Sequence, residues 1–429
     1  MSGRRGLIAA WCLYDFANSA FATTILAVLF NEYFARVLGG GMEGRLILGR
    51  RIPGPTLYTI LLSATLVLVA VTAPRVGIGA DRSRRPMAWL LALAVPAMAA
   101  TAGLGFLGPG DLAPAALLFG VALYGFALSS LIYNSLLPRI AGREMIGRVS
   151  GWGWGLGYLG GGLVLALNLG LIRGLDVGSW SITVDVPVTF TITAVWWALF
   201  TIPLIGAAGR IPPHPRPAAH AGVRRFLRTA ARSPNLARFL AANLLYGDGV
   251  QTVVAMAAIF GSVELGWAPD RLILYFLAIQ GAAFIGSMVL GRWSDRAGDR
   301  PVLLACLAVW IAIGVATWRL GWTGRPGAEY WGLGFLGGFI LGPTQSLARS
   351  YLARETPAAA AGSIFSLFAV SNRFAAILGP LTYGATVWLT GDLRLAVLTT
   401  VVFFVAGMAL LAGSRPEGLR VELRRVGSG

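Results

Sequence analysis

Twelve long apolar runs constrain this chain more than any other feature of its sequence. A helix needs about 20 mostly apolar residues to cross the hydrocarbon core of a bilayer. Runs of that kind lie near residues 7–36, 55–79, 87–108, 114–138, 149–172, 187–208, 236–262, 271–293, 301–320, 329–352, 361–388 and 394–413. Backbone polar groups in hydrocarbon must pair within the segment, so each run is predicted to be a helix. We therefore expect an all-α membrane protein with twelve transmembrane helices.

The overall composition agrees with a membrane protein. Of the 429 residues, 56% are hydrophobic and 12% are charged, whereas a soluble domain has about 25% charged residues. The net charge is +17, and the chain has no lysine. Its arginines lie mainly in short connections between apolar runs, which indicates membrane topology and argues against a nucleic-acid partner. Cys12 and Cys306 fall inside apolar runs, which favours packed thiols over a disulfide framework.

The arginines also predict an orientation. They concentrate on alternate connections, and the positive-inside rule places these connections and both termini in the cytoplasm. Arg45, Arg50 and Arg51 go against this rule in the first outer loop. Residues 2–5 are polar and the first apolar run is long enough to span, so no cleavable signal peptide is predicted. We expect a monomer.

A long linker divides the chain into two six-helix halves. The predicted parts are an N-terminal bundle at 1–208, a basic linker at 209–235, a C-terminal bundle at 236–413 and a cytoplasmic tail at 414–429. The prolines of 211–217 favour an extended segment. From Val223 to Arg232 an amphipathic helix is predicted on the anionic leaflet, with one apolar face made of Phe226, Leu227, Ala230 and Ala231. His214 and His220 are interpreted as solvated linker residues, and no metal or cofactor is predicted.

One charged hairpin occurs twice, once in each half. Both copies read Gly-x-x-x-Asp-Arg and continue to an Arg-Pro pair that opens the next apolar run. The alternative is a solvated turn that only carries positive charge. Asp81 and Asp295 are expected against nearby helix N-termini, where the dipole favours an anion, with Arg143, Glu144 and Arg148 as candidate partners. The candidate conformational residues are Gly77, Asp81, Arg82, Arg85, Gly291, Asp295, Arg296 and Arg300.

Three charged residues stand out within the predicted spans. A charge in the bilayer costs roughly 2.5–3.5 kcal/mol on insertion scales, so it usually faces a cavity and has a function. Asp248 and Arg373 lie near the midplane of their helices, and Asp15 is shallower. In the functional interpretation the acid carries a proton and Arg373 holds an anionic group. The alternatives are a static Asp248–Arg373 salt bridge and, for Asp15, a cytoplasmic cap or hairpin lock.

Polar residues on the first, fourth, seventh, tenth and eleventh predicted helices extend this candidate site. Single polar groups in membrane helices are often only interhelical hydrogen bonds, and we expect that role for about half of them. The candidate substrate or coupling residues are Tyr14, Asp15, Asn18, Asn134, Asn243, Tyr246, Asp248, Gln251, Gln345, Asn372 and Arg373. Glycines at 151, 153, 155, 157 and 160–162 indicate close helix packing, and a phosphate-binding loop is disfavoured inside a span.

Several motifs resemble a known family. The twelve spans, the six-plus-six division and the doubled hairpin resemble the major facilitator superfamily. Stretches from Tyr14 to Ile25, Asn134 to Pro138, Gly147 to Gly161, Asp248 to Val250 and Phe374 to Pro380 resemble the vacuole-effluxer family, bacterial relatives of the fungal autophagy-related vacuolar amino-acid exporter. The resemblance implies secondary transport by alternating access, with amino acids as substrates, in a bacterial cytoplasmic membrane. Where the family commonly has lysine, this chain has Arg373, and arginine does not release its proton readily, so any proton role moves to the acids.

The sequence thus predicts a proton-linked secondary transporter for a small polar organic solute. Two bundles would rock about a midplane site and expose it to each side in turn. A drug or lipid exporter on the same fold is one alternative, which an apolar cavity independent of Arg373 would favour. A non-transporting sensor is another. No nucleotide motif and no paired catalytic motif lies in a span, which argues against ATP-driven transport and against an enzyme.

Overall fold

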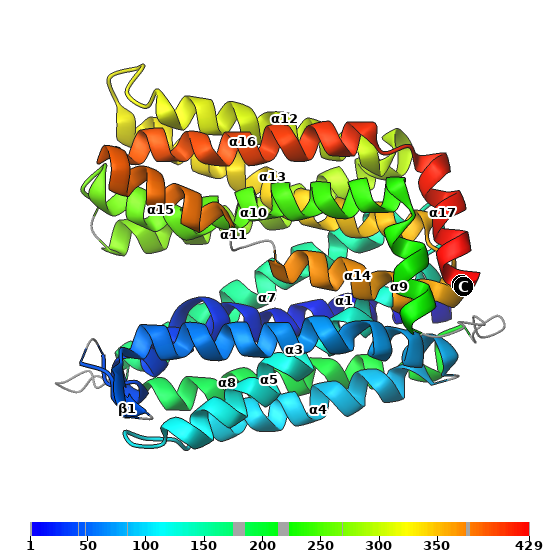
Figure 1. The fold of residues 1–429 in the computed structure, drawn as a ribbon, viewed down its shortest axis with the longest axis horizontal. Helices are drawn as coiled ribbons and strands as arrows, with labels where there is room; N and C mark the ends of the chain where they lie inside the picture. The colour runs from blue at the N-terminus through cyan, green and yellow to red at the C-terminus, as the bar shows by residue number, and fades with distance from the viewer. Residues whose placement is uncertain are drawn as a thin grey trace. The chain divides into compact units, whose positions relative to one another are not determined.

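The computed structural model describes residues 2–41, 43–47, 49–83, 85–174, 185–212, 223–267, 269–374 and 378–428. The side chains of some further helical residues, including Arg373, lie outside the described part. His214, His220 and the linker from residue 213 to 222 also fall outside it. The described residues are almost all helical (Figure 1).

The first six predicted spans each coincide with a helix or with consecutive helices. The first is one continuous helical run from Ser2 to Leu38, but two parts of it are π-helical, which the apolar pattern did not predict. A short hairpin follows it, with Arg45 opposite Ile52. In order, these elements are α1 (Ser2–Ala20), η1 (Phe21–Val28), α2 (Leu29–Tyr33), η2 (Phe34–Leu38), β1 (Arg45–Ile47), β2 (Arg50–Ile52), α3 (Gly54–Arg82), α4 (Pro86–Leu104), α5 (Leu112–Ser135), α6 (Leu137–Ile140), α7 (Ile146–Gly174), α8 (Asp185–Gly206) and η3 (Ala208–Arg210).

The last six predicted spans also coincide with helices, and one of them is described as two helices. The run predicted at 361–388 gives α14 and α15 on either side of residues 375–377, which lie outside the described part. The elements are α9 (Val223–Ala231), α10 (Pro234–Val263), α11 (Pro269–Ala297), α12 (Asp299–Trp318), α13 (Pro326–Glu355), η4 (Ala358–Ala360), α14 (Ala361–Phe374), α15 (Leu378–Thr390), α16 (Leu393–Gly413) and α17 (Pro416–Ser428).

Eight helical stretches among the described residues are long and apolar enough to cross a membrane. The other four predicted spans correspond to α7, α10, α13 and the α14–α15 pair. Most of the candidate site residues outside the first span lie on these four helices.

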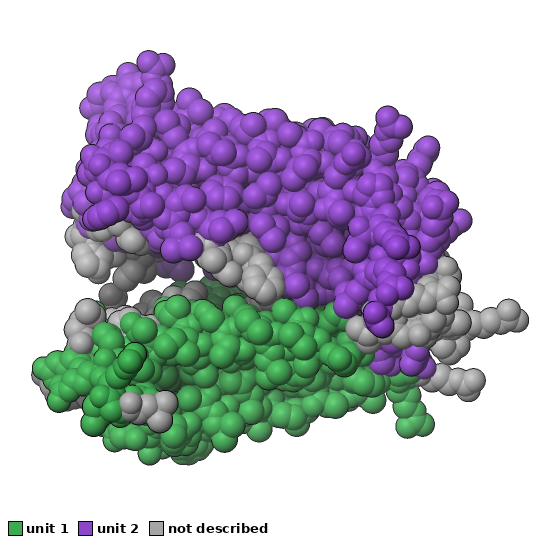
Figure 2. All heavy atoms as spheres, in the orientation of Figure 1, with its two compact units in different colours: residues 1–76, 83–134, 156–213 green, residues 77–82, 135–155, 214–429 purple. Residues whose placement is uncertain are grey.

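The chain divides into two compact units (Figure 2). The first contains residues 1–76, 83–134 and 156–213, and the second contains residues 77–82, 135–155 and 214–429. This division differs from the predicted bundle boundaries, because the end of α3 and the segment from the end of α5 to the start of α7 group with the C-terminal half. Helix α7 contributes residues to both units.

Each unit has an aromatic or close-packed helical core. In the first unit, Phe30 stacks on Phe119 at 4.8 Å between ring centroids and meets Phe190 edge-on at 5.5 Å. In the second unit, α10 packs along α16, and α11 packs along α13. The α11–α13 contact is close because Gly286 lacks a side chain: a Cβ there would lie 1.7 Å from the carbonyl oxygen of Phe339.

The amphipathic helix and the predicted tail both pack on protein. Helix α9 occupies the predicted position, but Phe226 and Ala230 are buried while Leu227 is exposed, and α9 contacts α10 and α17. The predicted face of four apolar residues is therefore divided, and half of it is covered by protein. Residues 416–428 form α17, whose Leu419, Leu423 and Val426 are fully buried.

Candidate functional site

The predicted polar group on α1 is buried. Tyr14 is fully buried, and Asp15 and Asn18 are 9% and 5% exposed. The Tyr14 ring lies 5.0 Å from that of Tyr133, which also stacks on Trp11 at 4.3 Å. Tyr14 thus contributes to an aromatic cluster between α1 and α5, next to a buried carboxylate on its own helix.

Asp248 on α10 binds the start of another helix. Its side chain is fully buried, and its two carboxylate oxygens accept hydrogen bonds from the backbone N–H groups of Leu378 and Gly379, each at 2.9 Å. These are the first two residues of α15, whose unpaired N–H groups attract an anion. The contact is tight, because a Cβ on Gly379 would lie 1.8 Å from the Thr252 hydroxyl. Asp248 therefore holds α15 to α10.

A neighbouring group of amides and hydroxyls binds the end of α14. The Asn243 amide nitrogen donates to the Asn372 side-chain oxygen at 2.7 Å and to the Ser371 hydroxyl at 3.2 Å. The Tyr246 hydroxyl donates to the Asn243 side-chain oxygen at 2.9 Å. The structure thus brings Asn243, Tyr246 and Asn372 together. Helix α10 binds both sides of the undescribed residues 375–377.

Other predicted site residues are not gathered into this group. Gln251 is exposed, although it follows the buried Asp248 by three residues on α10. Asn134 at the end of α5 and Gln345 in α13 are half-buried. Arg373 lies in α14, and its side chain is outside the described part, so the predicted pairing with Asp248 stays a prediction. Among the described residues, no group of His, Cys, Asp and Glu is arranged to hold a metal ion.

The first hairpin acid lies at a helix N-terminus, as predicted. Asp81 is 3% exposed and accepts hydrogen bonds from the N–H groups of Gly362 and Ser363, both at 2.7 Å, and from the Ser363 hydroxyl. Both residues belong to the first turn of α14. Gly77 allows this approach, because a Cβ there would lie 2.3 Å from the carbonyl oxygen of Gly362.

The second hairpin repeats this arrangement. Asp295 accepts hydrogen bonds from the N–H groups of Gly147 at 2.9 Å and Arg148 at 3.1 Å, in the first turn of α7. A Cβ on Gly291 would lie 2.8 Å from the carbonyl oxygen of Gly147. Arg148 is thus a partner of Asp295, as predicted, through its backbone and through an ion pair at 3.8 Å.

The basic residues of the two hairpins have less uniform surroundings. Arg82, Arg85 and Arg296 are exposed. Arg300 donates to the carbonyl oxygens of Leu411 and Ala412 at the end of α16, where the helix dipole favours a cation. The acids and glycines of the motif make the closest contacts, and Arg300 ties the second hairpin to α16.

Arg354, at the end of α13, joins the second hairpin to its neighbours. Its guanidinium pairs with Asp295 at 3.1 Å and with the buried Asp299 at 2.7 Å, and it donates to the carbonyl oxygen of Arg143. We call the contacts of Asp81, Asp295, Asp299 and Arg354 with one another and with the first turns of α7 and α14 the hairpin network. Neither Arg354 nor Asp299 belongs to the Gly-x-x-x-Asp-Arg motif, so the motif did not predict their roles.

Glu355 joins this region to the C-terminal helix. Its carboxylate pairs with Arg420 of α17 at 2.6 Å and with Arg143 at 3.4 Å. The hydrogen bond and the negative charge of Glu355 raise the pKa of the Arg420 guanidinium above its ordinary value. Glu422 of α17 accepts from the N–H groups of Asn235 and Leu236 at 3.1 and 3.0 Å, in the first turn of α10. None of these acids was identified from sequence, where they are isolated among basic residues.

The glycines of α7 act as predicted, in close helix packing. A Cβ on Gly151 would lie 2.2 Å from the carbonyl oxygen of Ser287 on α11, and one on Gly160 would lie 2.2 Å from that of Phe16 on α1. The first part of α7 therefore packs against α11 and the later part against α1. Gly162 has no atom within 4 Å of the Cβ position and makes no such contact.

Sequence comparison identifies the family of this close-packed helical protein. The family model described as "Vacuole effluxer Atg22 like" matches residues 143–418. The chain belongs to this family. It is 26% identical over 418 residues to the MFS-type transporter YxiO of Bacillus subtilis, covering 94% of this chain and 93% of YxiO. It is 29% identical over 297 residues to autophagy-related protein 22 of Cryptococcus neoformans, covering 64% of this chain and 54% of the fungal protein. The chain thus matches about half the length of that fungal relative.

Solved structures agree on the fold. The proton:xylose symporter XylE matches with a TM-score of 0.73 at 13% identity, covering 96% of both chains. A bacterial homologue of the iron transporter ferroportin also has a TM-score of 0.73, at 14% identity, covering 96% of this chain and 99% of that one. The protein is therefore a multi-pass integral membrane protein with the major facilitator fold. The family is described as effluxers and YxiO as an MFS-type transporter, so the protein is a transporter and not an enzyme.

Proposed function

We propose that this vacuole-effluxer family member is a proton-linked secondary transporter that moves an amino-acid-like solute by alternating access. The support is the family match, together with the vacuolar amino-acid exporter that the helix-one and helix-eleven motifs resemble. We further propose that it acts as a monomer in a bacterial cytoplasmic membrane, with both termini in the cytoplasm.

One observation carries the proton-linked part of this proposal. Asp248 is a fully buried carboxylate on a membrane helix, beside the polar group of Asn243, Tyr246 and Asn372. An intramembrane acid of this kind is costly and usually functional. Protonation would weaken its hold on the first turn of α15, because a neutral carboxyl group accepts weaker hydrogen bonds from N–H groups than a carboxylate does. Asp248 would then couple proton binding to the contact between α10 and α15.

The remaining predicted residues take secondary roles in this proposal. Arg373 would bind the carboxylate of the solute, with Asp15 and Asn18 as contacts from the other half. Asn134, Gln251 and Gln345 are kept as candidate contacts. The contacts of Asp81 with the first turn of α14 must break whenever the start of α14 separates from the end of α3. This part of the hairpin network would therefore act as a conformational lock.

The proton-linked proposal is tested by Asp248→Asn in proteoliposomes with an imposed pH gradient. Asparagine retains one side-chain oxygen for α15 but cannot carry a proton. We expect gradient-driven amino-acid uptake to disappear, while exchange of labelled for unlabelled solute without a gradient persists. Asp392→Asn is the matched control, because Asp392 accepts from the N–H groups of Arg394 and Leu395 at the start of α16 at an exposed position. Unchanged gradient-driven uptake in Asp248→Asn would exclude the coupling role.

The alternative of an amphiphile exporter is favoured by one observation. A cavity whose described lining is largely apolar lies within the C-terminal unit. A transport assay with amino acids and with amphiphilic cations, on the same vesicles, separates the two functions. Uptake of amphiphiles alone would establish the alternative.

A further inference from the structure

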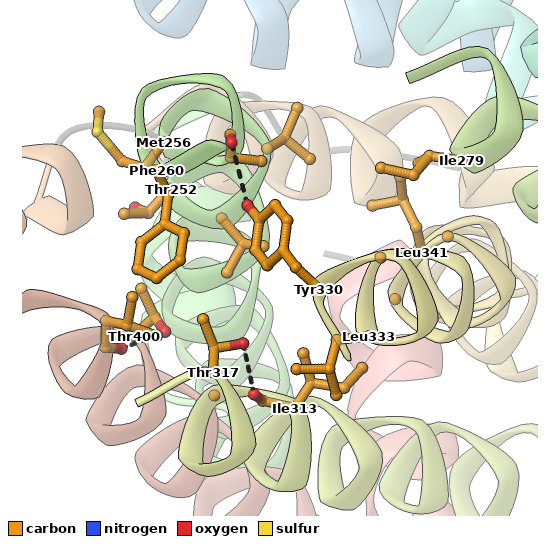
Figure 3. A pocket seen from close by; sticks show the side chains of 18 of the residues that line it. Thr252, Met256, Phe260, Ile279, Ile313, Thr317, Tyr330, Leu333, Leu341 and Thr400 are labelled. Atoms are coloured by element: carbon orange, nitrogen blue, oxygen red, sulfur yellow. Dashed lines mark hydrogen bonds between the residues drawn. The ribbon is translucent and has the colours of Figure 1, made fainter. Parts of the chain in front are cut away.

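A cavity of about 130 Å³ lies inside the C-terminal unit (Figure 3). Its walls come from α10, α11, α12, α13, α15 and α16, and every residue that lines it lies between Thr252 and Thr400. The rings of Phe260, Tyr275 and Tyr330 form one side, where Tyr275 stacks on Tyr330 with 5.1 Å between centroids. The cavity is thus contained within one unit.

Several hydroxyl groups around this cavity donate to backbone carbonyl oxygens. The Tyr330 hydroxyl donates to the carbonyl oxygen of Ala257 at 3.0 Å. Thr317 and Thr400 donate to carbonyl oxygens on their own helices, at 2.8 and 2.7 Å (Figure 3). Gln280 adds one amide, and none of the described residues that line the cavity is charged. The lining therefore offers an apolar surface despite its hydroxyl groups.

The space exists because α13 presents glycines on this side. A Cβ on Gly334 would lie 2.1 Å from the Tyr275 hydroxyl, so this glycine lets the ring pack against α13. A Cβ on Gly337 would have its nearest neighbours in Trp310 and Ile313, at 3.5 Å or more. Larger side chains along this face would occupy the cavity.

We propose that this cavity binds an apolar group about the size of a single aromatic ring. The hydroxyl groups of Thr317, Tyr330 and Thr400 have given their protons to backbone carbonyls, and an apolar cavity of about 150 Å³ stays dry and accepts benzene. The group comes either from a small aromatic molecule or from the apolar end of an amphiphile. Binding by apolar contact with the described lining requires no proton coupling, so this site goes beyond the proposed transport of amino-acid-like solutes.

The test is photolabelling with 3-phenyl-3-trifluoromethyl diazirine in nanodiscs, read by mass spectrometry. Phe260, Tyr275, Trp310 and Tyr330 are each at most 5% exposed, so a probe dissolved only in lipid does not reach them. We expect saturable labelling of these residues, displaced by toluene for a free aromatic ligand or by a lysophospholipid for an acyl chain. Labelling that neither competitor displaces, or none at these residues, would overturn the proposal.

Three substitutions make this test specific to the cavity. Thr317→Leu and Thr400→Leu each place extra volume in the cavity from different helices, and each should reduce labelling of the buried rings at least tenfold. Thr386→Leu is the matched control: Thr386 on α15 makes the same bond to a carbonyl oxygen one turn back, but does not line the cavity. The melting temperature of each variant verifies that it is folded. Undiminished labelling in both folded variants would also overturn the proposal. Transport by Asp248→Asn has no bearing on this result.

Discussion

Replacing Asp81 with asparagine weakens one half of the hairpin network by a predictable amount. The carboxylate accepts from two backbone N–H groups at 2.7 Å and from one hydroxyl. Hydrogen bonds to a charged group contribute about 1.5–3 kcal/mol and neutral ones about 0.5–1.5 kcal/mol. Asparagine keeps one oxygen and turns an NH₂ group toward the other donors, so we expect a loss of about 2 kcal/mol. Since 1.4 kcal/mol is a factor of ten, local opening should increase about 30-fold.

Hydrogen–deuterium exchange measures this opening directly. The amides of Gly362 and Ser363 are protected by Asp81, so their exchange should accelerate about 30-fold in Asp81→Asn, because exchange of a protected amide follows its opening equilibrium. Asp111→Asn is the control: its carboxylate accepts from the Gly108 N–H at 2.9 Å in a different connection, and it should leave the start of α14 unchanged. If the two amides exchange at the wild-type rate in folded Asp81→Asn, the network does not restrain α14.

Three further outcomes are expected. Gly160→Ala places a Cβ 2.2 Å from the Phe16 carbonyl oxygen and should lower stability by about 1–3 kcal/mol, measured by thermal unfolding in detergent. Gly162→Ala is the control and should not lower stability, because no atom lies within 4 Å of its Cβ position. Equal melting temperatures for the two variants would contradict the role of the glycines in close packing. Glu422→Gln removes the negative charge at the start of α10 and should cost about 1 kcal/mol, seen as faster amide exchange there; no change would show that α17 does not stabilise α10. Arg354→Gln leaves the buried Asp299 carboxylate without its cation and should cost about 3–5 kcal/mol at pH 8. Because an unpaired buried acid is neutralised at low pH, stability relative to wild type should recover toward pH 5, and a pH-independent deficit would contradict this explanation.

The apolar pattern predicted the positions of the helices because a membrane span has few alternatives to a helix. It failed where the backbone departs from a regular α-helix. In the run at 361–388, Pro380 indicates a helix start, because it lies in the first turn of α15, where a missing N–H costs nothing. The π-helical turns after Ala20 left no such signal, because their side chains continue the same apolar run.

The contacts of the hairpin network could be predicted from the sequence only in part, because a motif shows local spacing and not which distant elements meet. A glycine four residues before an acid, repeated in both halves, indicated that Asp81 and Asp295 lie at helix N-termini. Which helices they bind was not predictable, since Asp81 and Gly362 are 281 residues apart. Arg354 and Glu355 are ordinary charges at a helix end when read in sequence. Their role comes from elements that meet only in the folded chain.

The docked C-terminal helix makes the end of the chain a structural part of the transporter. Proteolytic loss of α17 would remove the acceptor from the first turn of α10 and one of the two arginines from Glu355, leaving that carboxylate with Arg143, whose side chain is 54% exposed. The same holds for a bulky fusion that pulls Leu419 and Leu423 out of their contacts. A purification tag attached after Gly429 therefore needs a flexible spacer, and an unspaced tag should raise the protease sensitivity of the start of α10.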